Sequence, residues 1–201
     1  LTQRIVSKAG TLTNINVIEI GPGPGALTRA LLDSQAKNIY CIERDTRFKM
    51  ALAEIQLLHP HRLHLITADA LSMDLSKICP PPRKIVSNLP FNIASKLLLS
   101  FLQSSNHFLG LILMFQKEVA ERLVAVPGSK TYGRLSVITQ LLYDVKLEFN
   151  IKKESFYPPP KVTSAVVSLT RKKKPIKPLS LRSLEIVTCA AFGQRRKMLR
   201  S

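Results

Sequence analysis

The amino-acid sequence predicts one α/β domain of the doubly wound kind, with a mostly parallel seven-stranded sheet and an antiparallel end strand. Five apolar, strand-like runs alternate with helix-like segments up to residue 124. This alternation implies right-handed crossovers and a parallel sheet that is covered on both faces. Two more strand-like runs follow with only a proline-rich stretch between them, so we expect the sheet to end in an antiparallel pair.

The expected boundaries follow from hydrophobic spacing. Strands are expected at residues 17–20, 39–42, 63–66, 85–87, 110–115, 145–151 and 164–169. Helices are expected at 2–9, 27–32, 47–58, 94–102, 116–124, 135–142 and 181–200. Residues 171–178, with the sequence RKKKPIKP, are expected to form a basic linker before the last helix.

The composition is that of a folded and strongly basic chain. Apolar residues make up 45% of the 201 residues, which is enough for a core. Lys and Arg number 30 against 13 Asp and Glu, and the formal net charge of +17 predicts attraction to a polyanion. No apolar run approaches the ~20 residues of a membrane-spanning helix, so we expect no membrane partner. Cys41, Cys79 and Cys189 are scattered, which favours a reducing compartment and no metal site.

A glycine-rich turn follows the first strand. Gly21, Gly23 and Gly25 allow positive φ and a close backbone approach to a ligand. Glu43 ends the second strand, twenty residues after Gly23, where a carboxylate can accept hydrogen bonds from ribose hydroxyls. NAD and S-adenosylmethionine both carry that ribose, so these residues alone leave both cofactors open.

Three details favour S-adenosylmethionine over NAD. Glu19 precedes Gly21 by two residues and would place negative charge near the amino-acid end of the cofactor. Pro22 and Pro24 remove two backbone N–H groups that a pyrophosphate would need. The third strand ends in Thr-Ala-Asp-Ala, where Asp69, beside Ala70, can accept a hydrogen bond from an adenine amino group. The alternative is a tight strand–helix turn that binds no ligand.

The fourth strand runs into the turn Asn88-Leu89-Pro90-Phe91. An adenine amine is a poor nucleophile because its lone pair is delocalised into the ring. The Asn88 side-chain oxygen and a backbone carbonyl near Leu89 or Pro90 can accept its hydrogens and free that pair, while Phe91 stacks on the base. Similar turns serve DNA adenine, RNA adenine and protein glutamine amines. The alternative is that Asn88 caps the helix near residue 94 and that Pro90 and Phe91 only pack.

Segments spread over nearly the whole chain carry a family resemblance. They are EIGPGPGALT (19–28), IERD (42–45), ADAL (68–71), NLPFNIAS (88–95), QKEVAERLVAVPGSKTYGRLSV (116–137), FYPPPKVTSAVV (156–167) and FGQRRKMLR (192–200). Together they resemble the small-subunit ribosomal RNA adenine N6,N6-dimethyltransferase family, and its bacterial members most. The segments after residue 115 are the specific ones, because they are not general methyltransferase motifs.

The resemblance implies a Rossmann-like, S-adenosylmethionine-dependent methyltransferase fold. It implies that the enzyme forms dimethyladenine at two adjacent adenines in a 3′-terminal hairpin of small-subunit rRNA, during ribosome biogenesis. The implied cofactor is S-adenosylmethionine, and the implied partner is small-subunit rRNA or the precursor of the small ribosomal subunit. A monomer in the cytoplasm is expected, with an organellar location left open.

The resemblance also assigns roles to individual positions. Those that correspond to cofactor contacts are Gly21, Glu43, Asp69 and Asn88. The amine site is formed by Asn88, Pro90 and Phe91. Phe156 matches an aromatic residue that packs against the target base. The expected RNA-backbone contacts are Lys161, Arg195, Arg196 and Lys197.

The chain departs from the family pattern at both ends. It begins with Leu1, inside an expected helix, and lacks a Gly-Gln-Asn-Phe-Leu segment that helps to cover the cofactor. We therefore expect a fragment or the ordered part of a longer protein, in which targeting peptides cannot be judged. Residues 1–170 are expected to form the catalytic domain, and residues 179–201 to begin a C-terminal helical domain that is otherwise missing.

Two rival functions stay open at this level. One is an antibiotic-resistance methylase that acts on large-subunit rRNA, whose family shares the glycine loop and the Asn-x-Pro-aromatic turn. The other is a non-catalytic nucleic-acid-binding assembly or transcription factor on the same fold. The intact residues Asn88, Pro90 and Phe91 argue against lost chemistry.

Binding to rRNA should depend strongly on salt. Each neutralised phosphate contributes a slope of about −0.7 to −0.9 in log K against log salt. Replacing Arg195, Arg196 and Lys197 together by Ala should therefore reduce the slope by about two to three units in a binding titration. An unchanged slope would exclude these residues from the RNA contact.

Overall fold

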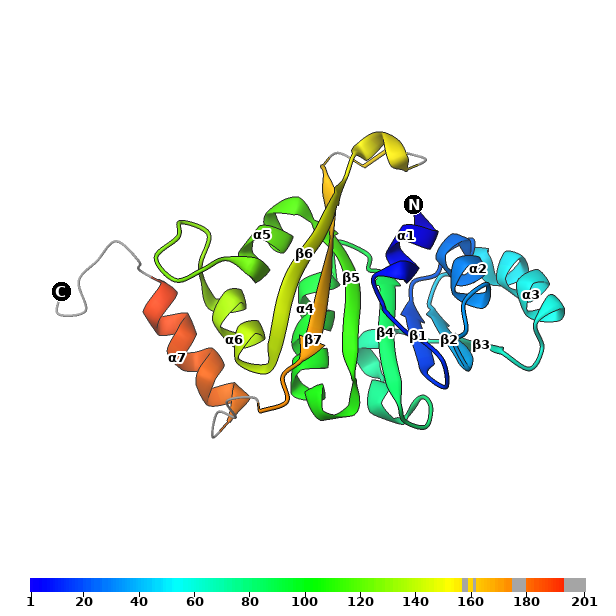
Figure 1. Cartoon of the computed structure of the whole chain (residues 1–201), viewed down its shortest axis with the longest axis horizontal. Helices are drawn as coiled ribbons and strands as arrows, with labels where there is room; N and C mark the ends of the chain where they lie inside the picture. Colours follow the sequence, from blue (N-terminus) through cyan, green and yellow to red (C-terminus); the bar gives the residue numbers. More distant parts are fainter. Residues whose placement is uncertain (157–158, 161, 175–179, 194–201) are drawn as a thin grey trace.

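The computed structural model describes residues 1–156, 159–160, 162–174 and 180–193. At its centre lies a seven-stranded sheet with the strand order β3-β2-β1-β4-β5-β7-β6 (Figure 1). β1 to β5 pair in parallel, whereas β7 runs antiparallel to both of its neighbours, β5 and β6. The predicted doubly wound sheet is confirmed, and its antiparallel strand lies one position in from the edge.

All seven expected strands are present. They are β1 Asn16–Ile20, β2 Asn38–Glu43, β3 Leu63–Thr67, β4 Arg83–Asn88, β5 Gly110–Gln116, β6 Tyr143–Ile151 and β7 Ser164–Arg171. The α-helices are α1 Thr2–Ser7, α2 Ala26–Leu32, α3 Lys49–Leu58, α4 Ala94–Gln103, α5 Lys117–Val124, α6 Arg134–Leu142 and α7 Leu181–Gly193. No described helix is long and apolar enough to cross a membrane.

Some helix boundaries differ from the prediction. The helix expected at 116–124 begins one residue later, because Gln116 still pairs with Ser164 in the sheet. The helix expected at 2–9 ends at residue 7, shortly before Gly10 turns the chain at a φ of 65°. The helix expected at 47–58 starts with a 3₁₀ turn, and α3 proper begins at Lys49. The part of the last expected helix beyond Gly193 lies outside the described residues.

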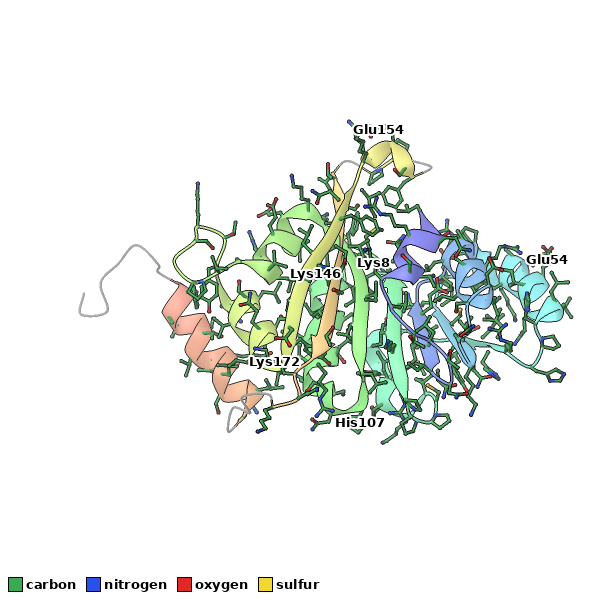
Figure 2. All side chains as sticks on the ribbon, viewed as in Figure 1. Lys8, Glu54, His107, Lys146, Glu154 and Lys172 are labelled. Atoms are coloured by element: carbon green, nitrogen blue, oxygen red, sulfur yellow. The ribbon has the colours of Figure 1, made fainter. Side chains whose placement is uncertain are left out.

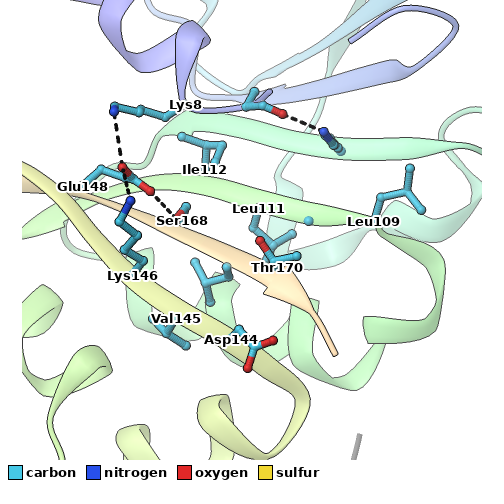
Figure 3. A pocket seen from close by; sticks show the side chains of 14 residues that line it. Lys8, Leu109, Leu111, Ile112, Asp144, Val145, Lys146, Glu148, Ser168 and Thr170 are labelled. Atoms are coloured by element: carbon cyan, nitrogen blue, oxygen red, sulfur yellow. Dashed lines mark hydrogen bonds and ion pairs between the residues drawn. The ribbon is translucent and has the colours of Figure 1, made fainter. Parts of the chain in front are cut away.

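β6 and β7 form a hairpin that extends past the carboxyl ends of the parallel strands, with Glu154 at its tip (Figures 1 and 2). β6 carries a bulge, because Leu147 pairs with Val167 while Phe149 pairs with Val166. Glu148 is the extra residue, and its carboxylate accepts a hydrogen bond from the Ser168 hydroxyl at 2.7 Å (Figure 3). A bulge of this kind bends the strand and changes the direction of the residues beyond it.

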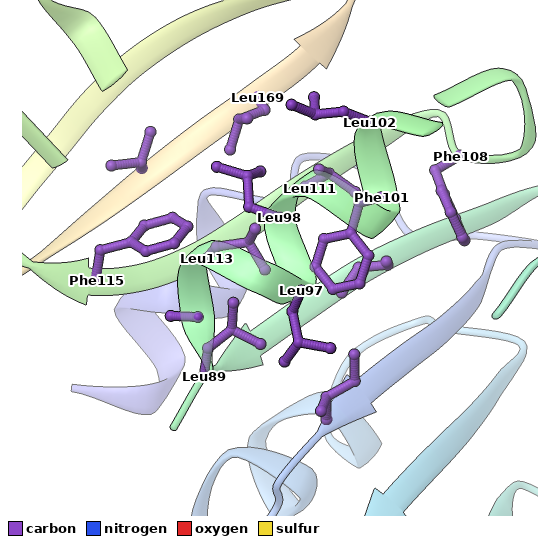
Figure 4. Close-up of a cluster of buried hydrophobic side chains, with 14 of the residues drawn as sticks. Leu89, Leu97, Leu98, Phe101, Leu102, Phe108, Leu111, Leu113, Phe115 and Leu169 are labelled. Atoms are coloured by element: carbon purple, nitrogen blue, oxygen red, sulfur yellow. The ribbon is translucent and has the colours of Figure 1, made fainter. Parts of the chain in front are cut away.

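Each face of the sheet carries its own buried cluster, because successive side chains of a strand point to opposite faces. On one face α4, α5 and α6 pack against side chains such as Ile85, Leu111 and Leu113 (Figure 4). On the other face α1, α2 and α3 pack against a second buried cluster of the sheet that includes Val86 and Ile112. The core thus fixes β4 and β5 from both sides, and β4 ends at the expected amine site.

The glycine loop and the Asn-Leu-Pro-Phe turn are neighbours, because β1 pairs directly with β4. The Ser87 hydroxyl, buried near the end of β4, donates a hydrogen bond to the Ile20 carbonyl at the end of β1, at 2.6 Å. The next residue, Gly21, turns away at a φ of 65° and donates its N–H to the Ile42 carbonyl of β2 at 2.9 Å. Both segments therefore leave the sheet at one place.

A buried carboxyl group lies at the base of this loop. Glu19 on β1 is 1% exposed, and its Oε2 accepts hydrogen bonds from the Thr28 hydroxyl at 2.7 Å and the Cys41 thiol at 3.4 Å. Thr28 belongs to α2 and Cys41 to β2, so one side chain joins three elements. Burial raises the pKa of Glu19 to about 7, although the hydrogen bonds from Thr28 and Cys41 act in the opposite direction.

Glu19→Gln should remove a pH dependence of stability. The pKa of Glu19 is about 7 in the folded state against an ordinary value of 4.5, so the folded protein keeps a proton that the unfolded chain has already lost. The free energy of unfolding should therefore fall by about 3 kcal/mol as the pH rises through that interval.

Chemical denaturation at pH 5 and pH 8 measures this effect. We expect Glu19→Gln to gain stability relative to the parent between the two pH values. Glu54→Gln, at an exposed position on α3, is the matched control and should show no such gain. Parallel pH profiles for the parent and Glu19→Gln would contradict the assignment.

Candidate active site

A cavity of about 330 Å³ lies at the carboxyl ends of β1, β2, β3 and β4. The strand order reverses between β1 and β4, and such a switch point is where doubly wound sheets bind their ligands. The residues that line the cavity are Ile20, Gly21, Gly23, Ile42, Glu43, Arg44, Asp45, Phe48, Ala68, Asp69, Ala70, Leu71, Pro90, Asn92 and Ile93. A larger hollow of about 820 Å³ beside α5, α6 and α7 contains none of the expected site residues.

The glycine loop forms one wall of the cavity and approaches the Asn-Leu-Pro-Phe turn closely. A side chain at Gly21 would place its Cβ 3.2 Å from Cγ of Pro90, and the φ of 65° at this position also favours glycine. At Gly23 a Cβ would meet no atom within 4 Å, which leaves room above the loop. The cavity wall therefore includes a close backbone approach at Gly21 and open space at Gly23.

Glu43 lines the cavity beside the glycine loop and is fixed by backbone hydrogen bonds. Its Oε2 accepts from the Gly23 N–H at 3.1 Å, and its Oε1 accepts from the Asp45 N–H at 2.7 Å. Each carboxylate oxygen can accept a second hydrogen bond. Glu43 is thus oriented before any ligand arrives and keeps the capacity to accept from two hydroxyl groups.

Asp69 lines the cavity beside Ala70, with a partner that the sequence did not indicate. Asp69 accepts a hydrogen bond from the Leu71 N–H at 3.0 Å and pairs with the Arg44 guanidinium at 3.1 Å. The Leu71 N–H and then Arg44 hold the pKa of Asp69 below its ordinary value. Arg44 follows Glu43 directly in the chain, and that adjacency was the available signal for a role at the cavity.

The Asn88 turn presents its residues to different surroundings. Asn88 ends β4 with an exposed side chain that makes no hydrogen bond to another described residue. Leu89 is 1% exposed and belongs to the core, whereas Pro90 lines the cavity. The residue that caps α4 is Ile93, and no side chain caps this helix. The alternative interpretation of Asn88 as a helix cap is therefore wrong.

Two aromatic side chains from distant parts of the chain meet the same buried cluster. Phe91 follows the Asn88 turn, and Phe156 follows the 3₁₀ turn at the tip of the β6–β7 hairpin. Both are half-buried and pack against the cluster that contains Met114 and Val166. Phe156 is therefore brought to the side of the sheet on which Phe91 lies.

Other expected site residues lie elsewhere. Glu19 is not among the residues that line the cavity, since its side chain is buried beneath the loop. The expected RNA contacts fall outside the described residues; they are Lys161, Arg195, Arg196 and Lys197. Among the described residues, no group of three or more His, Cys, Asp or Glu side chains could hold a metal ion.

The chain is similar to known sequences over its whole length. The ribosomal RNA adenine dimethylase family matches it over residues 1–201. A ribosomal RNA small subunit methyltransferase A from Paramagnetospirillum magneticum is 53% identical over 100% of this chain and 72% of its own length. The protein of the same name from Rhodospirillum rubrum is 50% identical over 100% of this chain and 70% of its own.

Two solved structures also resemble this chain. A dimethyladenosine transferase from Plasmodium falciparum has a TM-score of 0.86 and 30% identity, over 98% of this chain and 70% of its own. The 23S rRNA methyltransferase ErmE has a TM-score of 0.79 and 28% identity, over 96% of this chain and 76% of its own. On the match over its full length and on its similarity to these relatives, the chain belongs to the ribosomal RNA adenine dimethylase family.

Proposed function

We propose that this protein transfers methyl groups from S-adenosylmethionine to the N6 amine of adenine in small-subunit rRNA. The observation that carries the proposal is the close approach of Gly21 to Pro90, both of which line the cavity. It joins a nucleoside-sized cavity to the turn that ends β4, so a donor in the cavity and an amine at the turn share one boundary. The small-subunit relatives at 53% and 50% identity support this substrate over large-subunit rRNA.

The residues of the cavity fit the cofactor. Glu43 would hold the ribose, because it is oriented by two backbone N–H groups and retains free acceptor positions. Asp69 would accept from the adenine amino group, and Gly23 leaves space for the rest of the molecule. When bound, S-adenosylmethionine supplies an electrophilic methyl group on a sulfonium. The acidic groups of the wall suit that positive charge.

The turn supplies the acceptors that the amine needs. The Asn88 side-chain oxygen is exposed at the end of β4 and is unused by other described residues. The Pro90 carbonyl already accepts from the Ile93 N–H at 3.1 Å, which favours the Leu89 carbonyl as the second acceptor. Two acceptors around the amino hydrogens favour a tetrahedral nitrogen and release its lone pair. Catalysis is then mostly positioning on a rigid strand end.

The target base would lie between aromatic side chains. Phe91 follows the amine site in the chain, and Phe156 packs against the same cluster from the hairpin. Stacking of this kind holds an unpaired base, so the target adenine must leave its own stack to reach Asn88. Basic side chains around the site would hold the flanking backbone, in keeping with the net charge of +17.

The finer points of the proposal come from the family resemblance. They are dimethylation of two adjacent adenines in a 3′-terminal hairpin, action on the precursor of the small subunit, a monomeric enzyme and a cytoplasmic location. Incubation with small subunits that lack the modification, beside purified large subunits, tests the substrate. Methylation of adenine in the small subunit alone is expected. Methylation of the large subunit alone, or of neither, would overturn the proposal.

Glu43→Ala should weaken binding of S-adenosylmethionine while the fold survives. A hydrogen bond to a charged group contributes ~1.5–3 kcal/mol, so the dissociation constant should rise about tenfold or more in calorimetry. Glu43→Gln keeps one acceptor and should lose less. Glu54→Ala on α3 is the matched control. Unaltered affinity in Glu43→Ala, or tighter binding of NAD than of the methyl donor, would refute the assignment.

Asn88→Ala should slow methyl transfer far more than it weakens RNA binding. The Asn88 oxygen matters most when the amine becomes tetrahedral, so its loss should cost roughly 10²–10³ in rate. Phe91→Ala should act more mildly, through lost stacking of ~1–3 kcal/mol.

Single-turnover methylation with saturating RNA and cofactor measures both effects. Asn106→Ala is the control. Asn106 lies before the amino end of β5, at the opposite end of the strands, and its side-chain oxygen accepts a hydrogen bond from Arg171. If Asn88→Ala reacts near the parent rate, the amine site lies elsewhere.

A further inference from the structure

The amino-terminal helix α1 is anchored to the rigid part of the sheet. The Lys84 ammonium group of β4 donates a hydrogen bond to the Ala9 carbonyl, just past the end of α1, at 2.6 Å. The Gln3 side chain donates to the Asp33 carboxylate, just past the end of α2, at 3.0 Å. The buried side chains of α1 belong to the same cluster as those of α2 and α3. α1 is therefore a fixed part of the body of the protein.

Two cationic side chains, Arg4 within α1 and Lys8 at its carboxyl end, contact β6. The Arg4 guanidinium carbon lies 3.9 Å from the centroid of the Phe149 ring. The Lys8 ammonium nitrogen lies 3.4 Å from Oε2 of Glu148 (Figure 3). Figure 3 shows Lys8 and Lys146 at the same Glu148 carboxylate. These contacts join segments about 140 residues apart in the chain.

Both contacts fall at the bulge of β6. Glu148 is the extra residue of the bulge, and its side chain is 8% exposed. Burial alone would raise the pKa of Glu148, but the Ser168 hydrogen bond and the ammonium groups of Lys146 and Lys8 hold it below the ordinary value. A largely covered carboxylate with these partners is a firm attachment point. α1 thus holds β6 where the strand changes direction.

Beyond the bulge, the strand leads to the candidate active site. Phe149 and Ile151 belong to the buried cluster against which Phe91 and Phe156 pack. Phe156 lies at the end of the short 3₁₀ turn that follows β6. A shift of β6 at its bulge would therefore move Phe156 relative to Phe91 and the end of β4.

We infer that Arg4 and Lys8 are positioning residues for methyl transfer, because they hold the β6–β7 hairpin at its bulge and so set Phe156 against the target base. This inference rests on the proposed function. A helix that only stabilised the fold would make the same contacts, and the two roles differ in what they do to turnover. Arg4 and Lys8 need not touch the RNA or the cofactor for the inference to hold.

The variants are Arg4→Met, Lys8→Met and the pair of changes together. Met keeps most of the apolar length of each side chain and removes the charge. Lys146→Met is the matched control. The Lys146 ammonium lies 3.5 Å from the same Glu148 oxygen but belongs to β6 itself, so it cannot tie α1 to the hairpin. Lys8→Arg keeps the positive charge, so this variant should keep both the contact with Glu148 and the parent activity.

Single-turnover methylation with saturating RNA and cofactor gives the first readout. We expect the paired change to lower the rate about tenfold, and each single change by about threefold, while the affinity for S-adenosylmethionine stays within about twofold. Lys146→Met should keep the parent rate. The single variants decide the question if the paired variant does not fold.

Fluorescence of 2-aminopurine at the target position of a hairpin RNA gives the second readout. The chain has no Trp, so no indole interferes. Looser stacking should leave the probe brighter in the α1 variants than in the parent. A lower melting temperature with parent turnover and parent fluorescence would overturn the inference and leave α1 a structural brace. A parent that methylates no small subunit would instead refute the proposed function.

Discussion

The parallel pairing of β1 with β4 is the constraint on which the site depends. Adjacent strands lie about 4.8 Å apart, so the turn after one strand must lie beside the turn after the other. The register places Ile18 opposite Ile85, and the Ser87 hydroxyl then reaches the last carbonyl of β1. Gly21 and Pro90 therefore leave the sheet side by side, so that a Cβ added at Gly21 would lie 3.2 Å from Cγ of Pro90. The glycine loop and the Asn-Leu-Pro-Phe turn, far apart in sequence, thus border one cavity.

The sequence predicted the features that local patterns determine. Seven apolar runs separated by helix-like segments are enough to fix a doubly wound sheet, and residues directly after parallel strands must share an edge. Glu43, Asp69 and Pro90 lie together at this edge for that reason. The strand period of two also sends Glu19 to the opposite face from Ile18 and Ile20, which explains why its side chain is buried beneath the loop and not on the cavity wall.

The features that the sequence could not indicate depend on contacts between residues that lie far apart in the chain. A bulge leaves no local mark in a strand of ordinary composition, so the largely covered side chain of Glu148 could not be foreseen. Arg4 and Lys8 look like the polar face of a surface helix until the fold brings β6 beside them. The ion pair of Arg44 with Asp69 likewise joins two strand ends. Each contact depends on the sheet order, which is set by the packing of the whole domain.

The proposed function places two opposite requirements on the charges of the protein. RNA binding favours the overall charge of +17, whereas a sulfonium cofactor favours carboxylates. The cavity wall carries Glu43, Asp45 and Asp69 beside the cation of Arg44. At physiological salt, charges further apart than about 8 Å are largely screened when they face solvent. Acids clustered at one strand edge can therefore act on a bound cation while basic side chains elsewhere on the surface attract phosphate.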